Sequence, residues 1–153
     1  MTNLNLIMIF EKLIAIHNDR IEGYACASME TNDQDMIECF SDLIKTSRVC
    51  KMDLVTKIHI LGGRADRQHI LQGNFLCLLK YTAFAYREIG RQEILDSCNY
   101  GEVISRCNYE HVMRSSIRNL ILEYSTLIRS HFGLLELDHI KLRLLRDGLA
   151  QTA

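Results

Sequence analysis

The chain has 153 residues, of which 48% are hydrophobic, so a single domain with one sizeable core is expected. Its 18 Lys and Arg residues almost balance its 19 Asp and Glu residues. A formal net charge of −1 gives no strong field that would attract nucleic acid or an anionic membrane surface, so neither partner is expected.

The apolar residues 4–10 do not have the features of a targeting or membrane segment. They lack a basic leading region and a small-residue cleavage site, and Glu11 interrupts them well short of a membrane span. We therefore expect a cytoplasmic protein.

The cysteines and the missing β signals both favour an all-α protein. The six cysteines contain no CxxC pair, which argues against a zinc ribbon or a disulfide scaffold and favours reduced thiols acting as small apolar residues. They are Cys26, Cys39, Cys50, Cys77, Cys98 and Cys107. The chain has no proline and no segment that alternates with a two-residue period, so no strand is predicted.

The first two helices are predicted as an antiparallel hairpin. Apolar residues recur at three- and four-residue steps over about residues 3–28 and again up to Gly62-Gly63, where a glycine can take a left-handed cap. Residues 31–33 offer oxygens that can cap the second helix after a short connection. The predicted inward positions are Leu6, Phe10, Leu13, His17, Ile21 and Tyr24, then Met36, Phe40, Leu43, Ser47, Cys50, Leu54, Ile58 and Leu61.

Three further helices are predicted after an exposed connection at residues 64–72. A short helix covers about residues 74–89 with Gly90 as its terminator, a long helix covers residues 92–113, and a last long helix follows the capping pair Ser115-Ser116 and frays at Gly148. The inward positions of the two long helices are Ile94, Leu95, Cys98, Glu102, Ser105, Tyr109 and Val112, then Ile117, Leu120, Ile121, Tyr124, Ile128, His131, Leu135, Leu142 and Leu145.

Helix length predicts the topology. The short helix spans only about 24 Å, whereas the four long ones span about 33–45 Å at 1.5 Å per residue. If the short helix returns along the outside of the bundle, the fourth helix runs parallel to the second. The prediction is a four-helix bundle with one long crossover that contains an extra short helix.

A few polar residues fall on the inward stripes near the middle of their helices. They are His17, Ser47, Cys50, Glu102 and His131, whereas Asp19 is expected on the side opposite its stripe. Buried polar groups at one level of a bundle either satisfy one another or bind a ligand.

With this layer the chain resembles the ferritin-like superfamily, and within it a family of uncharacterised bacterial four-helix bundles classed as a domain of unknown function. The matching stretches are residues 18–24 (NDRIEGY), residues 61–63 (LGG), Gly101-Glu102 followed by Tyr109, and Tyr124 followed by His131. The resemblance covers most of the chain. It implies the fold and a link to stress responses or metals, but no established reaction.

The chain departs from the ligand set of the metal-oxidising members, which carry a carboxylate on each of two helices and Glu-x-x-His on each of the other two. Only Glu102 and His131 fit that pattern. The one formal Glu-x-x-His, residues 136–139, lies toward the end of the last helix with Glu136 far from the stripe, and we interpret it as chance.

Two interpretations of the polar layer remain. In the first, the layer is a buried network and the protein is a structural or interaction module that needs no reaction and no cofactor. In the alternative, His17, Glu102 and His131, with Cys50 as a fourth ligand, bind one zinc or iron ion in a metal-binding or metal-oxidising protein. A thiol nucleophile built from Cys50 and His17 is disfavoured because a mid-bundle thiol is sealed from substrate.

A homodimer is predicted from apolar residues on the outer faces of the short third helix and of the last helix. Leu134, Leu137 and Leu144 form an apolar row that a monomer would expose to water. The sequence does not identify any other protein partner.

Overall fold

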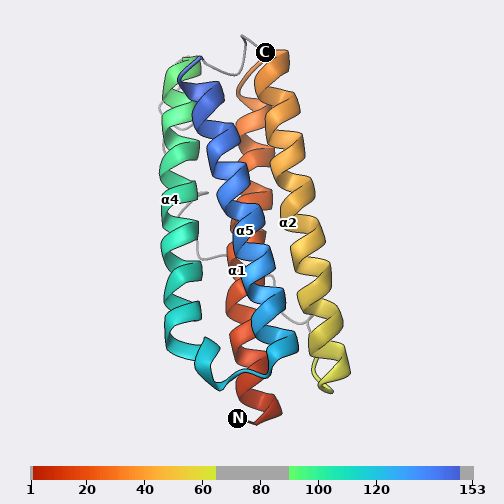
Figure 1. Ribbon diagram of the computed structural model, residues 1–153. Coiled ribbons are helices and arrows are strands. Elements are labelled where there is room, and N and C mark those ends of the chain that lie inside the picture. Colours follow the sequence, from red (N-terminus) through yellow and green to blue (C-terminus); the bar gives the residue numbers. More distant parts are fainter. Residues whose placement is uncertain (1, 65–89, 149–153) are drawn as a thin grey trace.

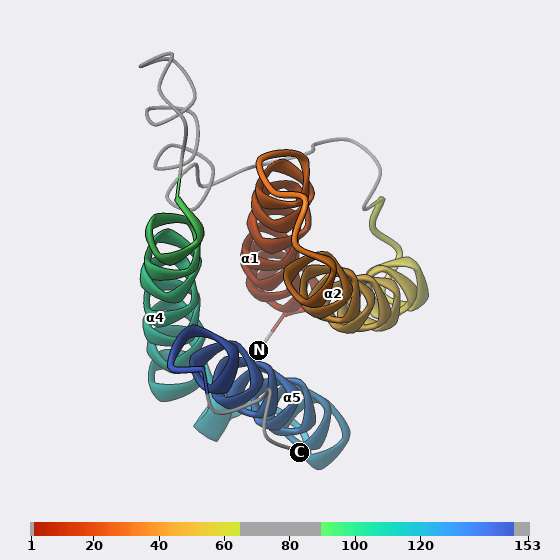
Figure 2. The ribbon, with the colours of Figure 1, turned by 90° about the horizontal axis from the view of Figure 1, so that it is seen from above.

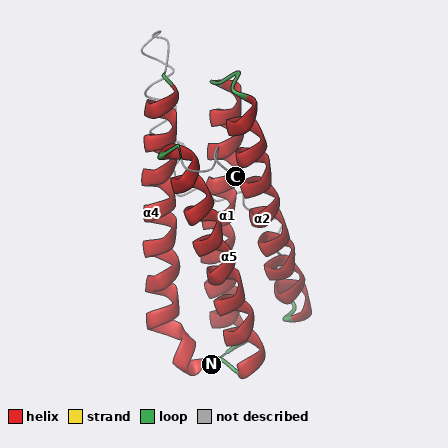
Figure 3. Cartoon of the chain, turned by 45° about the horizontal axis from the view of Figure 1, so that its top comes forward, coloured by secondary structure: helices red, strands yellow, loops and turns green. Residues whose placement is uncertain are grey.

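The computed structural model describes residues 2–64 and 90–148. In these two segments the chain forms the helices α1 (Asn3–Met29), α2 (Gln34–Ile60), α4 (Arg91–Ser116) and α5 (Leu122–Arg146), with a 3-10 turn, η2 (Ile117–Asn119), between the last two. The two described segments contain no strand, and short loops join α1 to α2 and α4 to α5 (Figure 3). The all-α prediction is confirmed for them.

The four helices form a bundle in which α1 is antiparallel to α2 and α4 is antiparallel to α5 (Figure 1). In Figure 1, α1 and α5 run upward, whereas α2 and α4 run downward. Seen from above, the helices lie at the corners of a four-sided arrangement, with α1 packed against α2 and α4, and α5 packed against α4 and α2 (Figure 2). The predicted parallel relation between α2 and α4 is thus observed. The predicted short helix at residues 74–89 lies outside the described residues.

The predicted inward stripes form the core, with a few exceptions. Ile21, Leu61, Ile117 and Leu120 are only half-buried, and the predicted inward position of Ile121 is wrong because this residue is 60% exposed beside the turn between α4 and α5. Two apolar clusters fill the bundle, one built around Phe10, Leu54 and Ile128 and the other around Tyr24, Phe40 and Leu142. A layer of buried polar side chains lies at the middle of the helices. Its members are His17, Arg20, Ser47, Glu102, Ser105, His131 and Asp138.

The C-terminus of α2 is closed by a Schellman motif at Gly62-Gly63. Gly62 has φ +86° and donates its N–H to the His59 carbonyl at 3.0 Å, while the Gly63 N–H donates to the Ile58 carbonyl at 2.9 Å. A Cβ on Gly63 would lie 2.9 Å from side-chain carbons of Ile58 and Ile7. The predicted left-handed glycine cap is confirmed, and its second glycine is needed for close packing.

The capping prediction at the start of α2 is only partly correct. Asp33 does occupy the N-cap position, but its side chain makes no capping hydrogen bond. Its carboxylate instead accepts from Arg91 Nη1 at 3.0 Å, which ties the start of α2 to the start of α4. Charge pairing with another helix has replaced the local hydrogen bond.

The prediction that Ser115-Ser116 begins the last helix is wrong. Helix α4 continues through Ser116, and α5 begins only at Leu122 after the 3-10 turn. Ser115 donates its hydroxyl back to the Val112 carbonyl at 3.2 Å, so it closes α4 instead of opening α5. The apolar period continued through the turn in the sequence, although the backbone has to break there to reverse direction.

The expected outward position of Asp19 is also wrong, because this residue is buried. All residues from Leu13 to Arg20 are buried, so α1 is covered around its circumference over two turns and not along one stripe. A single apolar stripe predicts one covered face, whereas α1 packs against two neighbouring helices, α2 and α4.

Candidate functional site in the polar layer

Arg20 lies at the centre of the polar layer, and the sequence did not single it out. The side chain is fully buried, and its guanidinium donates from Nε to Glu102 Oε1 at 2.9 Å and from Nη2 to Asp138 Oδ2 at 3.0 Å. Its Nη1 donates to Ser47 Oγ. One cation on α1 therefore contacts a polar side chain on each of the other three long helices.

Hydroxyl groups complete the surroundings of the two carboxylates. Tyr24 donates its phenolic O–H to Glu102 Oε1, and Thr46 donates to Asp138 Oδ1 at 3.2 Å. Within the described residues, Glu102 Oε2 has no hydrogen-bond partner. We call Arg20, Tyr24, Ser47, Glu102 and Asp138 the arginine network.

The charges in the arginine network offset the cost of burial. Burial would lower the pKa of Arg20, but the charge of Glu102, with smaller contributions from Tyr24 and Asp138, raises it above its ordinary value. Burial raises the pKa of Asp138, and the neighbouring Arg20 opposes that shift. The guanidinium therefore stays charged and is the counterion that both carboxylates share.

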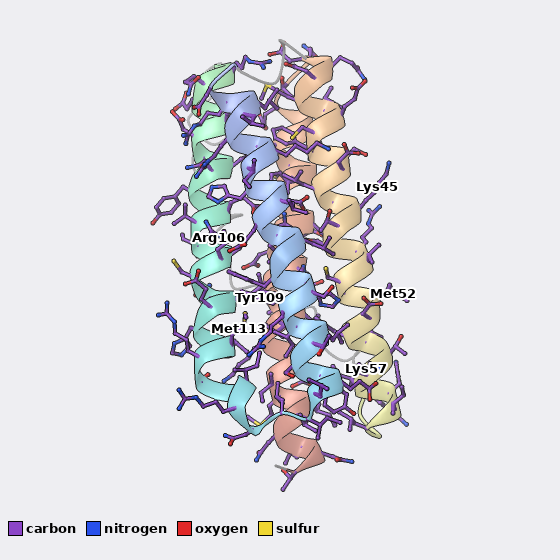
Figure 4. All side chains as sticks on the ribbon, in the orientation of Figure 1. Lys45, Met52, Lys57, Arg106, Tyr109 and Met113 are labelled. Atoms are coloured by element: carbon purple, nitrogen blue, oxygen red, sulfur yellow. The ribbon has the colours of Figure 1, made fainter. Side chains whose placement is uncertain are left out.

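A second group of polar side chains lies one helical turn away on α1 and α2. His17 Nδ1 is hydrogen-bonded to Ser47 Oγ at 3.1 Å, and its Nε2 to the Tyr109 hydroxyl at 3.3 Å. Figure 4 shows Tyr109 on the side of α4 that faces α5. One ligand atom from each of His17, Cys50 and His131 lies within 4.8 Å of the others, and all three residues are buried. We call these three residues the His-Cys-His cluster.

His131 differs from His17 in having one unpaired nitrogen. Its Nε2–H donates to Asp53 Oδ2 at 2.9 Å, and its Nδ1 has no hydrogen-bond partner among the described residues although the residue is only 2% exposed. Buried polar atoms are nearly always hydrogen-bonded, so this nitrogen requires an explanation.

The predicted four-residue metal site is therefore split. The structure brings His17, Cys50 and His131 together, but Glu102 belongs to the arginine network. Its Oε1 accepts hydrogen bonds from Arg20 and Tyr24. Glu102 was assigned to the histidines because all lie near mid-helix, and the sequence did not reveal that a guanidinium would pair with it.

The protonation of the cluster is set by burial. Burial, together with the charge of Arg20 and the neighbouring His131, lowers the pKa of His17 well below its ordinary value. Burial raises the pKa of the Cys50 thiol to about 12, an effect that Arg20 only partly opposes. At neutral pH a neutral imidazole thus faces a protonated thiol, which is the opposite of an activated cysteine nucleophile.

Residues 136–139, whose Glu-x-x-His spacing we interpreted as chance, include two buried residues, Asp138 and His139. The Nδ1 atom of His139 accepts a hydrogen bond from Arg106 Nη1 at 3.1 Å, and its Nε2–H donates to Asn99 Oδ1 at 2.9 Å. Glu136 lies at the surface side and pairs with Arg106 at 3.5 Å. The sequence does indicate an inward position for Asp138, since it lies seven residues after His131 and so shares its helical stripe.

The sequence matches no protein-family model and no curated protein. Among the described residues, no helix combines the length and the apolar character that crossing a membrane requires.

Proposed function

We propose that this protein is a ferritin-like bundle with a single crossover, in which an internal ion pair has replaced the di-iron centre, and that it acts as a structural or interaction module. The observation that carries the proposal is the buried guanidinium of Arg20 between Glu102 and Asp138.

The chemistry of a di-iron centre conflicts with this arrangement. Such centres need several inward carboxylates to bridge and neutralise two dications. Here the two carboxylates already share a cation that cannot be deprotonated, and a metal beside it would meet like-charge repulsion in a buried site. Oxidation of ferrous iron is therefore not the expected activity.

The arginine network suits a structural role because it joins all four long helices. Arg20 and Tyr24 come from α1, Ser47 from α2, Glu102 from α4 and Asp138 from α5. Buried polar networks restrict the arrangements in which every group is satisfied, and so they can fix the register of packed helices. The network would keep the bundle in one arrangement and its outer faces in fixed positions.

The outer face of α5 is the proposed interaction surface. Leu137 is 64% exposed and Ile140 48%, and with Leu134 and Leu144 they form an apolar row on this helix. Apolar residues in such a row are covered when two copies pack by the same face, as in a two-fold homodimer.

Two measurements test the proposal. Aerobic mixing with ferrous iron should give oxidation no faster than in buffer, and catalysed oxidation would contradict the structural role. Sedimentation equilibrium should give twice the 17.7 kDa chain mass. Leu137→Glu should reduce the measured mass to that of a monomer.

Met52→Glu is the matched control for the dimer. Met52 is 61% exposed on the outer side of α2 (Figure 4), so a charge there should leave the dimer intact. A monomer mass for the unmodified chain at tens of micromolar, or equal effects of the two substitutions, would contradict the α5 interface.

A further inference from the structure

We infer that His17, Cys50 and His131 form a binding site for a single zinc ion, separate from the arginine network. This inference goes beyond the proposed function, because a mononuclear site neither uses Glu102 nor requires any reaction.

The first support is the convergence of three donors from three helices. His17 lies on α1, Cys50 on α2 and His131 on α5, and their ligand atoms lie within 4.8 Å of one another. Around a tetrahedral zinc with Zn–S and Zn–N bonds of about 2.3 and 2.0 Å, neighbouring ligand atoms are roughly 3.3–3.6 Å apart. Shifts of about 1 Å, within the reach of side-chain rotation, would close the site around an ion.

The second support is the unpaired nitrogen of His131. Asp53 accepts from Nε2–H at 2.9 Å, which fixes the tautomer that leaves a lone pair on Nδ1. That atom is buried and has no hydrogen-bond partner among the described residues. A carboxylate behind a histidine is the usual outer contact of a zinc-binding imidazole, and here it is built before any ion is added.

His17 is held by hydroxyl groups on both sides. Ser47 Oγ contacts Nδ1 and the Tyr109 hydroxyl contacts Nε2, at 3.1 and 3.3 Å. Whichever nitrogen turns to the ion, the other keeps a hydroxyl contact that orients the ring. The site therefore has an outer contact for each histidine.

The donor set and its charge favour zinc over the harder iron. One thiolate and two imidazoles are borderline-to-soft ligands, and three protein ligands leave a fourth position for water. On binding, the Cys50 S–H bond breaks, the proton leaves to solvent and a Zn–S bond forms with no change in oxidation state. The thiolate and the Asp53 carboxylate together balance the charge of Zn²⁺. The nearby charge of Arg20 is already offset by Glu102 and Asp138.

Asp53 also marks a route to the site. Its side chain is 47% exposed whereas that of His131 is 3% exposed, so this hydrogen-bonded pair connects the buried cluster to the surface of the bundle. An ion could first meet the Asp53 carboxylate and then pass to the histidines.

Titration of the metal-free chain with Co²⁺, followed by competition with Zn²⁺, tests the inference. We expect one ion per chain and a thiolate-to-cobalt charge-transfer band that Zn²⁺ abolishes. Cys50→Ser should remove the band, and His131→Ala should remove stoichiometric binding. Asp53→Asn should weaken Zn²⁺ binding about 10–100-fold, as loss of an outer carboxylate typically does.

Two other cysteines supply matched controls. Cys98 is fully buried and Cys107 is exposed, and neither belongs to the cluster, so Cys98→Ser and Cys107→Ser should leave the band and the stoichiometry unchanged. Asp53 is half-exposed, so the Asp53→Asn chain should fold normally. It keeps the zinc site testable if the Cys50→Ser chain fails to fold.

Three results would contradict the zinc site. They are Zn²⁺ binding to the chain no tighter than to a buffer molecule, a charge-transfer band that survives Cys50→Ser, and a Zn²⁺ affinity that Asp53→Asn leaves unchanged. None of these results bears on iron oxidation or dimer mass, so the zinc site and the structural role fail separately.

Discussion

Replacing Arg20 by Met tests whether the arginine network holds the bundle together. Met has a similar length and no charge, so the substitution leaves the core filled but leaves Glu102 as a fully buried carboxylate without its counterion. Breaking a buried ion pair from one side typically costs about 3–5 kcal/mol. Since a domain of this size has a total stability of about 5–15 kcal/mol, Arg20→Met should lose between about a fifth and all of it.

A second substitution separates the buried charge from the lost packing. Glu102→Gln in the Arg20→Met chain removes the uncompensated charge and keeps an oxygen for the Tyr24 hydroxyl, so it should recover about 2 kcal/mol. In the unmodified chain the same Glu102→Gln should destabilise, because it removes the counterion of Arg20. The sign of its effect therefore reverses with residue 20.

Urea unfolding followed by circular dichroism measures these free energies, and Arg91→Met is the control. Arg91 also pairs with two carboxylates, Asp33 and Asp35, but its side chain is 34% exposed, so its loss should cost less than about 1 kcal/mol. Equal effects of Arg20→Met and Arg91→Met, or a further loss of stability when Glu102→Gln is added to Arg20→Met, would show that the buried charge of the arginine network does not stabilise the bundle.

Two further predictions concern pH and the helix ends. Because burial lowers the pKa of His17, the unfolded chain binds more protons than the folded chain below about pH 6.5, so the stability present above that pH is lost on acidification by up to about 1.4 kcal/mol per pH unit. His17→Gln should therefore flatten the dependence of the unfolding free energy on pH, measured by urea unfolding at several pH values. Gly62→Ala should lower the stability by about 1–2 kcal/mol, because Gly62 has a positive φ that alanine disfavours. Gly133→Ala should raise the stability by up to about 1 kcal/mol, because Gly133 lies within α5 with open space around the added methyl group. Thermal melts in which Gly133→Ala is the less stable of the two would contradict this assignment of backbone effects.

The helices and their inward faces were predictable because helical periodicity is a local property. On α2 the predicted positions Met36, Phe40, Leu43, Ser47, Cys50, Leu54 and Ile58 are all fully buried. The α4–α5 boundary was not predictable in the same way, because the apolar period continued through residues 117–121 while the backbone reversed.

The arginine network was missed because its contacts are long-range. Arg20 lies 82 residues from Glu102 and 118 residues from Asp138, and a charged residue in a helix is assigned to the surface unless a partner is known. The position itself carried a signal, since Arg20 follows His17 by one turn and precedes Tyr24 by another, and both of those residues were correctly placed inside.

The separation of the polar layer into two levels follows from the antiparallel hairpin. Moving from His17 to Arg20 advances one turn along α1, and because α2 runs the opposite way, the matching step on α2 goes back from Cys50 to Ser47. The sequence thus places His17 with Cys50 and Arg20 with Ser47, as observed. The level that Glu102 joins depends instead on how far α4 is shifted along the bundle relative to this hairpin, and no local pattern sets that shift. This is why the histidine and cysteine ligands could be paired from sequence, whereas the carboxylate was assigned to the wrong level.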